Sequence, residues 1–227
     1  MVDLLEIRNQ RLSTLLSDFM ICLSCGIVDR DQERMKVGHP CPRCRVPGQG
    51  ARGYFPISVN SLIDLMQEFY HMKQEADSDE APIAKQKGNH QLAVVFFFCT
   101  LGEVLLENFL KRFMSQGGLS RLIQERLLND NIFVKQRVEK LFPALTGVRW
   151  KVAVKTLSKG KQLDYVKTTE FYESVVEKRN LFLHKGNKWA IPKDMPEKCL
   201  RQIWSMLNLF VALHNKYVAG QPVSRPS

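Results

Sequence analysis

The segment "EKRNLFLHKGN", residues 177–187, places an arginine, an asparagine and a histidine within six residues: Arg179, Asn180 and His184. An imidazole with an ordinary pKa of about 6.5 can donate or accept a proton at neutral pH. An arginine fork can hold a phosphate and stabilise the charge that develops on it, and an amide beside them can orient the reacting groups. These residue types suit metal-free cleavage of RNA, in which the 2′-hydroxyl attacks the neighbouring phosphorus.

The spacing of these residues is informative only if the segment is helical. Residues four apart share one face of a helix, so Asn180 and His184 are expected to stack. Arg179 starts about 100° round the helix, and its long side chain can swing towards the pair. Gly186 follows directly, which places His184 in the last turn of the predicted helix.

A structural interpretation of the same residues stays open. A protonated His184 would stabilise the C-terminal end of a helix, and Arg179 would form a surface ion pair. The spacing alone does not decide, because Arg34 and His39 repeat it by chance in a loop between cysteines. Asn180 and the helical setting favour the chemical interpretation of the second occurrence.

Four cysteines form a second candidate site, with the spacing C-x2-C-x15-C-x2-C: Cys22, Cys25, Cys41 and Cys44. Two such pairs predict a tetrahedral zinc site in which two turns converge on one ion. Gly26 follows the first pair, where a turn needs a residue free to take a positive φ. Because thiolates fill all four positions, the predicted Zn²⁺ is structural, and no catalytic metal is expected.

Other interpretations of the cysteines are a disulfide pair or a redox C-x2-C motif. Both fit less well in a chain in which no secretory signal is evident, because the cytosol keeps thiols reduced. His39 could replace one cysteine as a ligand, although four cysteines make it a neighbour instead. Cys99 and Cys199 lie in apolar helical contexts and are expected to be buried thiols.

The charge balance predicts an acidic partner. The 227 residues include 33 Lys and Arg against 23 Asp and Glu, which gives a net charge of +10. Nucleic acid is the first candidate partner and an anionic membrane surface is the second, while a basic surface without such a partner remains the alternative. The longest apolar run, "LAVVFFFCTLG", is too short to span a bilayer, so a cytoplasmic protein without a membrane segment is expected.

The elements that must position these residues are predicted to be mostly helical. Apolar periodicity and composition predict an N-terminal amphipathic helix at residues 1–20, a zinc ribbon at 21–52, an all-α bundle at 57–218 and a flexible tail at 219–227. Within the bundle, helices are expected at about residues 58–76, 90–116, 119–129, 131–142, 168–184 and 194–218. Residues 151–166 fit a strand or a helix, and Gly117 with Gly118 should end the long helix.

Two stretches resemble one known family. "RNLFLH", near the end of an amphipathic helix, resembles the R-x4–6-H signature of the HEPN superfamily, in which a polar residue commonly follows the arginine. "FFFCTLGEVLLENFLKRF" is similar to an earlier helix of that family that carries an acidic residue among apolar ones. Glu103 is the position that matches this residue, and Glu107, one turn further on, is the alternative.

The resemblance implies a HEPN-like helical bundle over residues 57–218, with the zinc ribbon outside it. It implies a metal-independent endoribonuclease of the toxin or phage-defence type, whose two copies pair so that both motifs line one cleft. RNA and a second copy are therefore the implied partners, and a cognate inhibitor or defence-system partner would fit such a system. The implied roles are acid/base catalysis for His184, phosphate contact for Arg179, positioning for Asn180 and orientation for Glu103.

Two further functions remain open at this stage. In the first, the bundle is a non-catalytic module that binds RNA, nucleotides or a partner, with a structural zinc ribbon. In the second, the chain is a zinc-ribbon transcription regulator with a helical dimerisation domain. The second would leave the motif of residues 179–184 unexplained.

Overall fold

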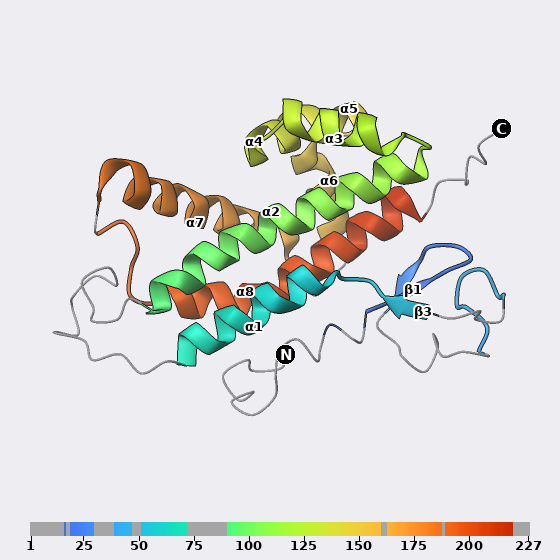
Figure 1. Ribbon diagram of the computed structural model, residues 1–227. Helices are drawn as coiled ribbons and strands as arrows, with labels where there is room; N and C mark the ends of the chain where they lie inside the picture. Colours follow the sequence, from blue (N-terminus) through green and yellow to red (C-terminus); the bar gives the residue numbers. More distant parts are fainter. Residues whose placement is uncertain are drawn as a thin grey trace. The chain divides into compact units, whose positions relative to one another are not determined.

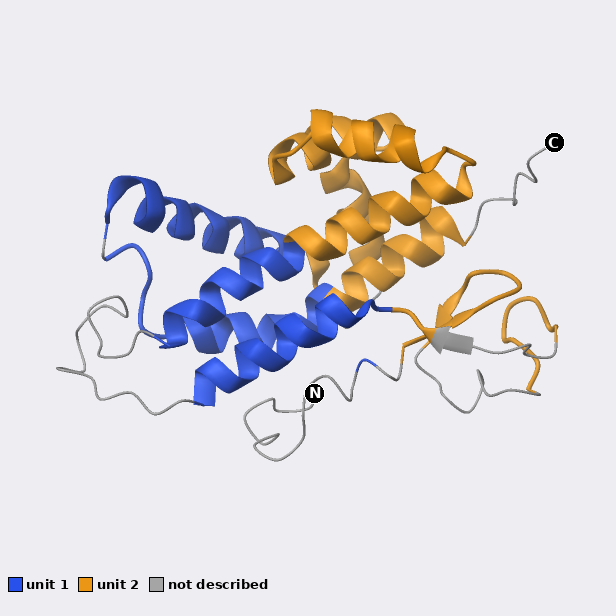
Figure 2. Ribbon diagram, in the orientation of Figure 1, with its two compact units in different colours: residues 1–17, 55–102, 167–206 blue, residues 18–54, 103–166, 207–227 orange. Residues whose placement is uncertain are grey.

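The computed structural model is mostly helical, as the sequence predicts, with a small antiparallel sheet near the N-terminus (Figure 1). It describes residues 16, 19–29, 39–46, 51–71, 90–159, 163–187 and 189–219. The chain divides into two compact units (Figure 2). Unit 1 comprises residues 1–17, 55–102 and 167–206, and unit 2 comprises residues 18–54, 103–166 and 207–227.

Helices of different length follow one another along the chain. They are α1 (Ile57–His71), α2 (His90–Gln116), α3 (Arg121–Asp130), α4 (Val134–Gln136), a π-helical turn (Arg137–Leu141), α5 (Phe142–Thr146), α6 (Trp150–Ser158), α7 (Tyr165–Lys185), α8 (Met195–Leu213) and a second π-helical turn (His214–Val218). The expected helix at 90–116 is confirmed. Gly118, two residues after its end, has a φ of 77°.

Unit 1 is built around the first half of α2. Its apolar core combines α1, the start of α2, α7 and the start of α8, and includes Val59, Ile63, Met66, Val94, Val95, Phe98, Cys99, Val175, Cys199 and Ile203. Cys99 and Cys199 are buried, as expected, and both are free thiols. These contacts fix the helix that carries the RNLFLH motif.

A glycine on α2 sets the distance to α7. A Cβ atom at Gly102 would lie 2.2 Å from Cε2 of Tyr172, so no larger residue fits there without moving the ring. The Tyr172 hydroxyl donates to the carbonyl of Cys99 at 3.0 Å, and the ring of Phe171 packs edge-on against Phe98 at 5.8 Å. Close backbone approach therefore anchors α7 about two turns before Arg179.

Unit 2 has an aromatic core. Phe142 contacts the rings of Phe109, Trp150 and Tyr217 at 5.8, 5.1 and 5.9 Å between centroids. Trp150 also lies 6.3 Å from Phe210. Large rings with offset or edge-on contacts stabilise a core through both buried area and geometry.

The segment between α3 and α7 differs in part from the prediction. The helix expected at 131–142 is divided into α4, a π-helical turn and α5, and α5 extends to Thr146. The chain turns at Gly147, whose φ is 71°. Of residues 151–166, which fitted strand or helix, 151–158 belong to α6 and 165–166 begin α7. Trp150, Ala153 and Val154 all face the core at helical spacing.

The sheet has the order β2-β1-β3, with β1 at Met20–Cys22, β2 at Val28–Asp29 and β3 at Ala51–Gly53. Both pairings are antiparallel, and Ile21 lies opposite Val28. Met20, which the sequence placed at the end of an N-terminal helix, opens β1. Most of the predicted helix at 1–20 and of the predicted tail at 219–227 lies outside the described residues.

Among the described residues, α2 is the one helix long and apolar enough to cross a membrane. This differs from the expectation that no segment would qualify, because the helix is longer than the apolar run visible in the sequence. Half of its most apolar window is buried inside the fold. Core helices of soluble proteins have the same properties, so α2 is weak evidence for a membrane span.

Candidate functional site

The four predicted metal ligands come together. The Sγ atoms of Cys22, Cys25, Cys41 and Cys44 all lie within 4.8 Å of one another. Two of the separations are 4.0 Å, from Cys22 to Cys44, and 3.7 Å, from Cys25 to Cys41. Tetrahedral Zn²⁺ with sulfur bonds of about 2.3 Å requires sulfurs about 3.8 Å apart. The four thiols therefore fit such an ion, and none of them forms a disulfide.

The two C-x2-C turns have the same backbone geometry. In the first, the N–H of Cys22 donates to Ile27 and its carbonyl accepts from Gly26, both at 2.9 Å. In the second, Cys41 makes the equivalent bonds with Val46 and Arg45, both at 3.0 Å. The residue after each pair has a positive φ, 71° at Gly26 and 62° at Arg45. The sequence indicated this requirement at Gly26 but not at Arg45.

The thiols differ in acidity before a metal binds. Burial raises the pKa of Cys25 to about 12. Burial also opposes ionisation of Cys41, but hydrogen bonds from the backbone N–H groups of Cys44 and Arg43 outweigh it and lower the pKa to about 7. Backbone donors that stabilise a thiolate also stabilise a metal-bound sulfur, so Cys41 is prepared to act as a ligand at neutral pH.

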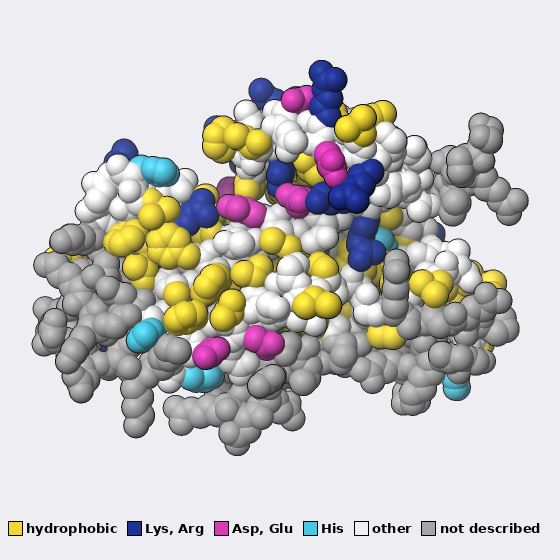
Figure 3. Space-filling model, in the orientation of Figure 1, with side chains coloured by type: hydrophobic (Ala, Val, Ile, Leu, Met, Phe, Trp, Pro, Cys, Tyr) yellow, Lys and Arg dark blue, Asp and Glu magenta, His cyan; other side chains and the backbone are white. Residues whose placement is uncertain are grey.

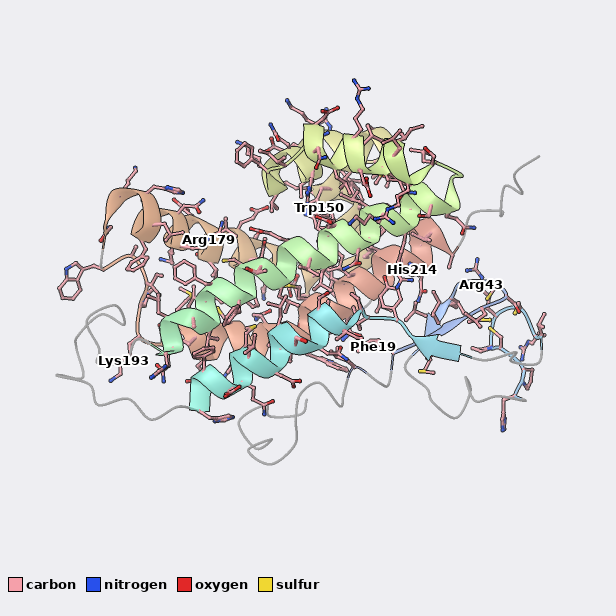
Figure 4. All side chains as sticks on the ribbon, in the orientation of Figure 1. Phe19, Arg43, Trp150, Arg179, Lys193 and His214 are labelled. Carbon is pink, nitrogen blue, oxygen red and sulfur yellow. The ribbon has the colours of Figure 1, made fainter. Side chains whose placement is uncertain are left out.

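The cysteine ribbon, described at residues 20–29, 39–46 and 51–53, is held by the π-helical turn that follows α8. The amide of Asn215 bonds both backbone groups of Val28: Oδ1 accepts from its N–H and Nδ2 donates to its carbonyl, each at 2.7 Å. Nε2 of His214 lies 2.8 Å from the carbonyl of Gly26. Arg43 donates to the carbonyl of Ala219 at 2.8 Å, and Figure 4 shows Arg43 and His214 on this side of unit 2.

His214 is neutral in this position. Only 2% of its surface is exposed, and burial lowers its pKa to about 4, helped by the positive charge of Arg112. Because a carbonyl can only accept, Nε2 must carry the proton and donate to Gly26. The ring packs edge-on against Tyr54 at 4.9 Å, and Arg112 lies 4.6 Å from the Tyr54 centroid. The imidazole therefore joins the metal ribbon to the core of unit 2.

Sequence reasoning missed His214 and Asn215. Both belong to the π-helical turn that follows α8, and π-turns often mark functional positions. The available signal was a pair of polar residues, "HN", inside the apolar stretch "LFVALHNKYV". Their partners lie 188 and 187 residues away along the chain, so no local pattern could have identified them.

The RNLFLH motif lies where the sequence predicted it, at the C-terminal end of α7. The helix ends at Lys185, and Gly186 follows with a φ of 61°. The N–H of Asn187 donates back to the carbonyl of Leu181 at 3.2 Å, which closes the last turn. The His184 side chain is exposed, and no side-chain hydrogen bond or ion pair joins it to another residue in the described part of the chain.

Two residues of the motif contact each other directly. Both Nε and Nη2 of Arg179 lie 3.3 Å from Oδ1 of Asn180, and both side chains are half-buried (Figure 4). The contact holds the guanidinium beside the face that Asn180 shares with His184. It also orients the Asn180 amide, because its oxygen faces the guanidinium and its NH₂ group remains able to donate elsewhere.

The two acidic candidates on α2 have different surroundings. Glu107 pairs with Lys111 at 2.7 Å and with Arg137 at 2.9 Å. Burial alone would raise its pKa, but these two cations lower it. Acidic and basic side chains lie beside one another on this face of unit 2 (Figure 3). Glu107 thus has a structural role, in which it ties the first π-helical turn to α2.

Glu103 is half-buried on α2 and belongs to unit 2, whereas Arg179, Asn180 and His184 belong to unit 1. Its orienting role therefore stays a prediction. The structure brings Arg179 and Asn180 into contact, and it places His184 one helical turn beyond Asn180.

A comparison with protein-family models, curated proteins and solved structures finds no match. The likeness to HEPN domains therefore depends on the motif of α7, the acidic helix and the helical fold.

Proposed function

We propose that this protein is a metal-independent endoribonuclease of the HEPN type, acting as a homodimer in the cytoplasm. The observation that carries the proposal is the arrangement at the end of α7, where Arg179 contacts Asn180 and His184 lies exposed one turn away. His184 would move protons between the 2′-hydroxyl, the leaving 5′-oxygen and water. Arg179 would hold the phosphate, and Asn180 would position the nucleophile.

The exposure of His184 is the reason for proposing a dimer. The His184 imidazole is open to water on one chain, whereas efficient phosphate chemistry benefits from a site that excludes water and supplies several donors. A second copy placed with its own α7 against the first would enclose both motifs. The exposed apolar side chain of Leu183, 51% accessible beside His184, suits such a contact.

For the cysteine ribbon we propose a structural Zn²⁺. The four cysteine thiolates would fill all four coordination positions of the ion, so no position remains for water or substrate. The bonds from His214 and Asn215 would connect the metal-bound ribbon to the helices of unit 2. The ion would contribute no chemical step.

A second function is favoured by one observation. Within the described residues no acceptor orients the His184 ring, whereas catalytic imidazoles are commonly held by a partner. A non-catalytic module that binds RNA or a nucleotide through Arg179 would not need an oriented imidazole. In that case the protein would bind RNA without cutting it.

The test is incubation of the purified protein with a mixed RNA pool in EDTA, with circular dichroism to show that the helices persist. We expect cleavage by the wild type and none by His184→Ala. Arg179→Lys keeps the charge but loses the fork, so its kcat should fall by a factor on the order of 100.

The matched control is His71→Ala. His71 is also an exposed histidine in the last turn of a helix of unit 1, and it has no place in the proposed site. Cleavage that persists in His184→Ala would contradict the assignment of the acid/base group. RNA that is bound but left intact by the folded wild type would favour the non-catalytic function.

A further inference from the structure

Helix α6 presents a row of basic side chains to solvent. Lys151 and Lys155 are exposed four residues apart on α6, and Arg149 at the N-cap and Lys159 at the C-cap are exposed at its two ends. Residues at this spacing lie about 6 Å apart along one side of a helix. We call Arg149, Lys151, Lys155 and Lys159 the α6 basic stripe.

The opposite side of α6 is fixed in the core of unit 2. Trp150, Ala153 and Val154 are buried, and the Trp150 ring lies 5.1 Å from the ring of Phe142 and 6.3 Å from that of Phe210. The helix therefore cannot rotate to hide its lysines. The stripe is a permanent feature of the surface of unit 2.

Nothing nearby in the sequence neutralises the stripe. Residues 140–163 contain no Asp or Glu but six Lys and Arg. None of the four stripe residues forms an ion pair with a residue in the described part of the chain. Ion pairs do occur elsewhere in unit 2, at Glu107 with Lys111 and at Arg121 with Glu125.

Lys151, in the first turn, opposes helix stability, whereas Lys155, in the last turn, suits the helix dipole. Like charges four residues apart repel each other, and basic residues in the first turn of a helix interact unfavourably with its dipole. The first turn of α6 has no acidic residue to offset this. Residues that destabilise an otherwise stable helix are expected mainly where they serve a function.

We propose that the α6 basic stripe binds the phosphodiester backbone of single-stranded RNA. The row of ammonium groups matches the regular succession of phosphates along an extended strand, and its affinity would come from counterion release without sequence readout. This binding surface is separate from the RNLFLH motif, and it does not depend on the proposed cleavage.

Two other anionic partners fit less well. A helix that lies on a membrane buries its apolar face among the lipid chains, but the apolar face of α6 is already buried against Phe142 and Phe210. An acidic protein would have to provide carboxylates at a matching spacing, whereas every RNA provides phosphates at regular intervals. RNA is therefore the partner that the stripe fits best.

The experiment measures binding of a labelled single-stranded oligoribonucleotide with 2′-O-methyl sugars, which cannot be cut through 2′-hydroxyl attack. The test variant combines Lys151→Ala, Lys155→Ala and Lys159→Ala. Each lost phosphate contact should reduce the slope of log K against log salt by about 0.7, so the slope should fall by about 2. In about 0.1 M salt the affinity should fall by a factor on the order of 100.

The matched control removes three other exposed cations of unit 2: Arg126→Ala, Lys135→Ala and Lys140→Ala. It should change the slope much less, and the triple Lys→Arg variant of the stripe should retain wild-type binding. Alanine removes the repulsion within α6, so the test variant should melt no lower than the wild type. If it melts lower, the triple Lys→Gln variant takes its place.

Three results would overturn the proposal. The first is an equal loss of affinity in the stripe and control variants, which would show that only net charge matters. The second is an unchanged salt slope in the stripe variant. The third is unchanged RNA binding with loss of binding to phosphatidylserine vesicles, which would assign the stripe to a membrane surface. A loss of RNA affinity confined to the stripe variant would support it.

Discussion

Replacing Asn215 with leucine should loosen the cysteine ribbon from the helices of unit 2. The Asn215 amide makes two hydrogen bonds of 2.7 Å to the N–H and carbonyl of Val28, and Val28 is only 3% exposed. Leucine has a similar size but neither donates nor accepts. Both backbone groups of Val28 would lose their partner in a site that water reaches poorly.

The expected cost follows from these two groups. Leaving one buried backbone group without a partner costs about 1–3 kcal/mol, so the Asn215→Leu variant should lose about 3 kcal/mol of stability. For a chain of this size, that loss corresponds to a fall in Tm of about 6 to 12 °C. Asn215→Asp keeps an acceptor for the Val28 N–H but places a carboxylate against the Val28 carbonyl. Its stability should lie between those of the wild type and Asn215→Leu.

The assay combines thermal melting with the rate at which a chromogenic chelator removes the metal. Asn129→Leu is the control, because Asn129 is exposed on α3. We expect Asn215→Leu to melt lower and to release metal faster than the control. The reasoning is refuted if the two variants melt together and release metal at the same rate, since the Asn215 bonds would then contribute nothing.

Three further predictions concern the packing, the turns and the pH dependence. Gly102→Ala should cost about 2 kcal/mol in urea unfolding, because overpacking against Tyr172 outweighs the better helix propensity, and a stable variant would show that α7 can move aside. Arg45→Gly should slow metal release, because glycine adopts the positive φ of this position without strain, and Gly26→Ala should speed metal release. Effects of both substitutions in the same direction would contradict the equivalence of the two turns. His214 binds its proton with a folded pKa of about 4 and an unfolded pKa of about 6.5, so the unfolded state binds more protons between these values. Stability relative to His214→Gln should therefore fall by about 3 kcal/mol as the pH falls from 6.5 to 4, measured by urea unfolding, and a constant difference would exclude a buried neutral imidazole.

Helices and their ends could be predicted where local sequence signals mark them. Helix α2 could be predicted because an apolar run begins near His90 and two glycines follow Gln116, where the helix ends. The end of α7 could also be predicted, because Gly186 directly follows the last helical residue. The division of residues 131–146 into α4, a π-helical turn and α5 was missed, because helical periodicity is almost the same on both sides of a π-turn.

The candidate sites show the same limit. The cysteine spacing was sufficient to predict that four sulfurs converge. It could not show that Asn215 and His214 hold the ribbon, since their partners are nearly the whole chain away. Likewise, the motif predicted that Asn180 and His184 share a face, while the contact from Arg179 to Asn180 depends on rotamers that no spacing specifies.

Mass spectrometry of the RNA ends, after incubation with the purified protein in EDTA, tests the proposed cleavage directly. Attack by the 2′-hydroxyl must leave a 2′,3′-cyclic phosphate on one product and a 5′-hydroxyl on the other. We expect these ends from the wild type and His71→Ala, and none from His184→Ala. Products with a 5′-phosphate and a 3′-hydroxyl, or identical products from His184→Ala, would contradict it.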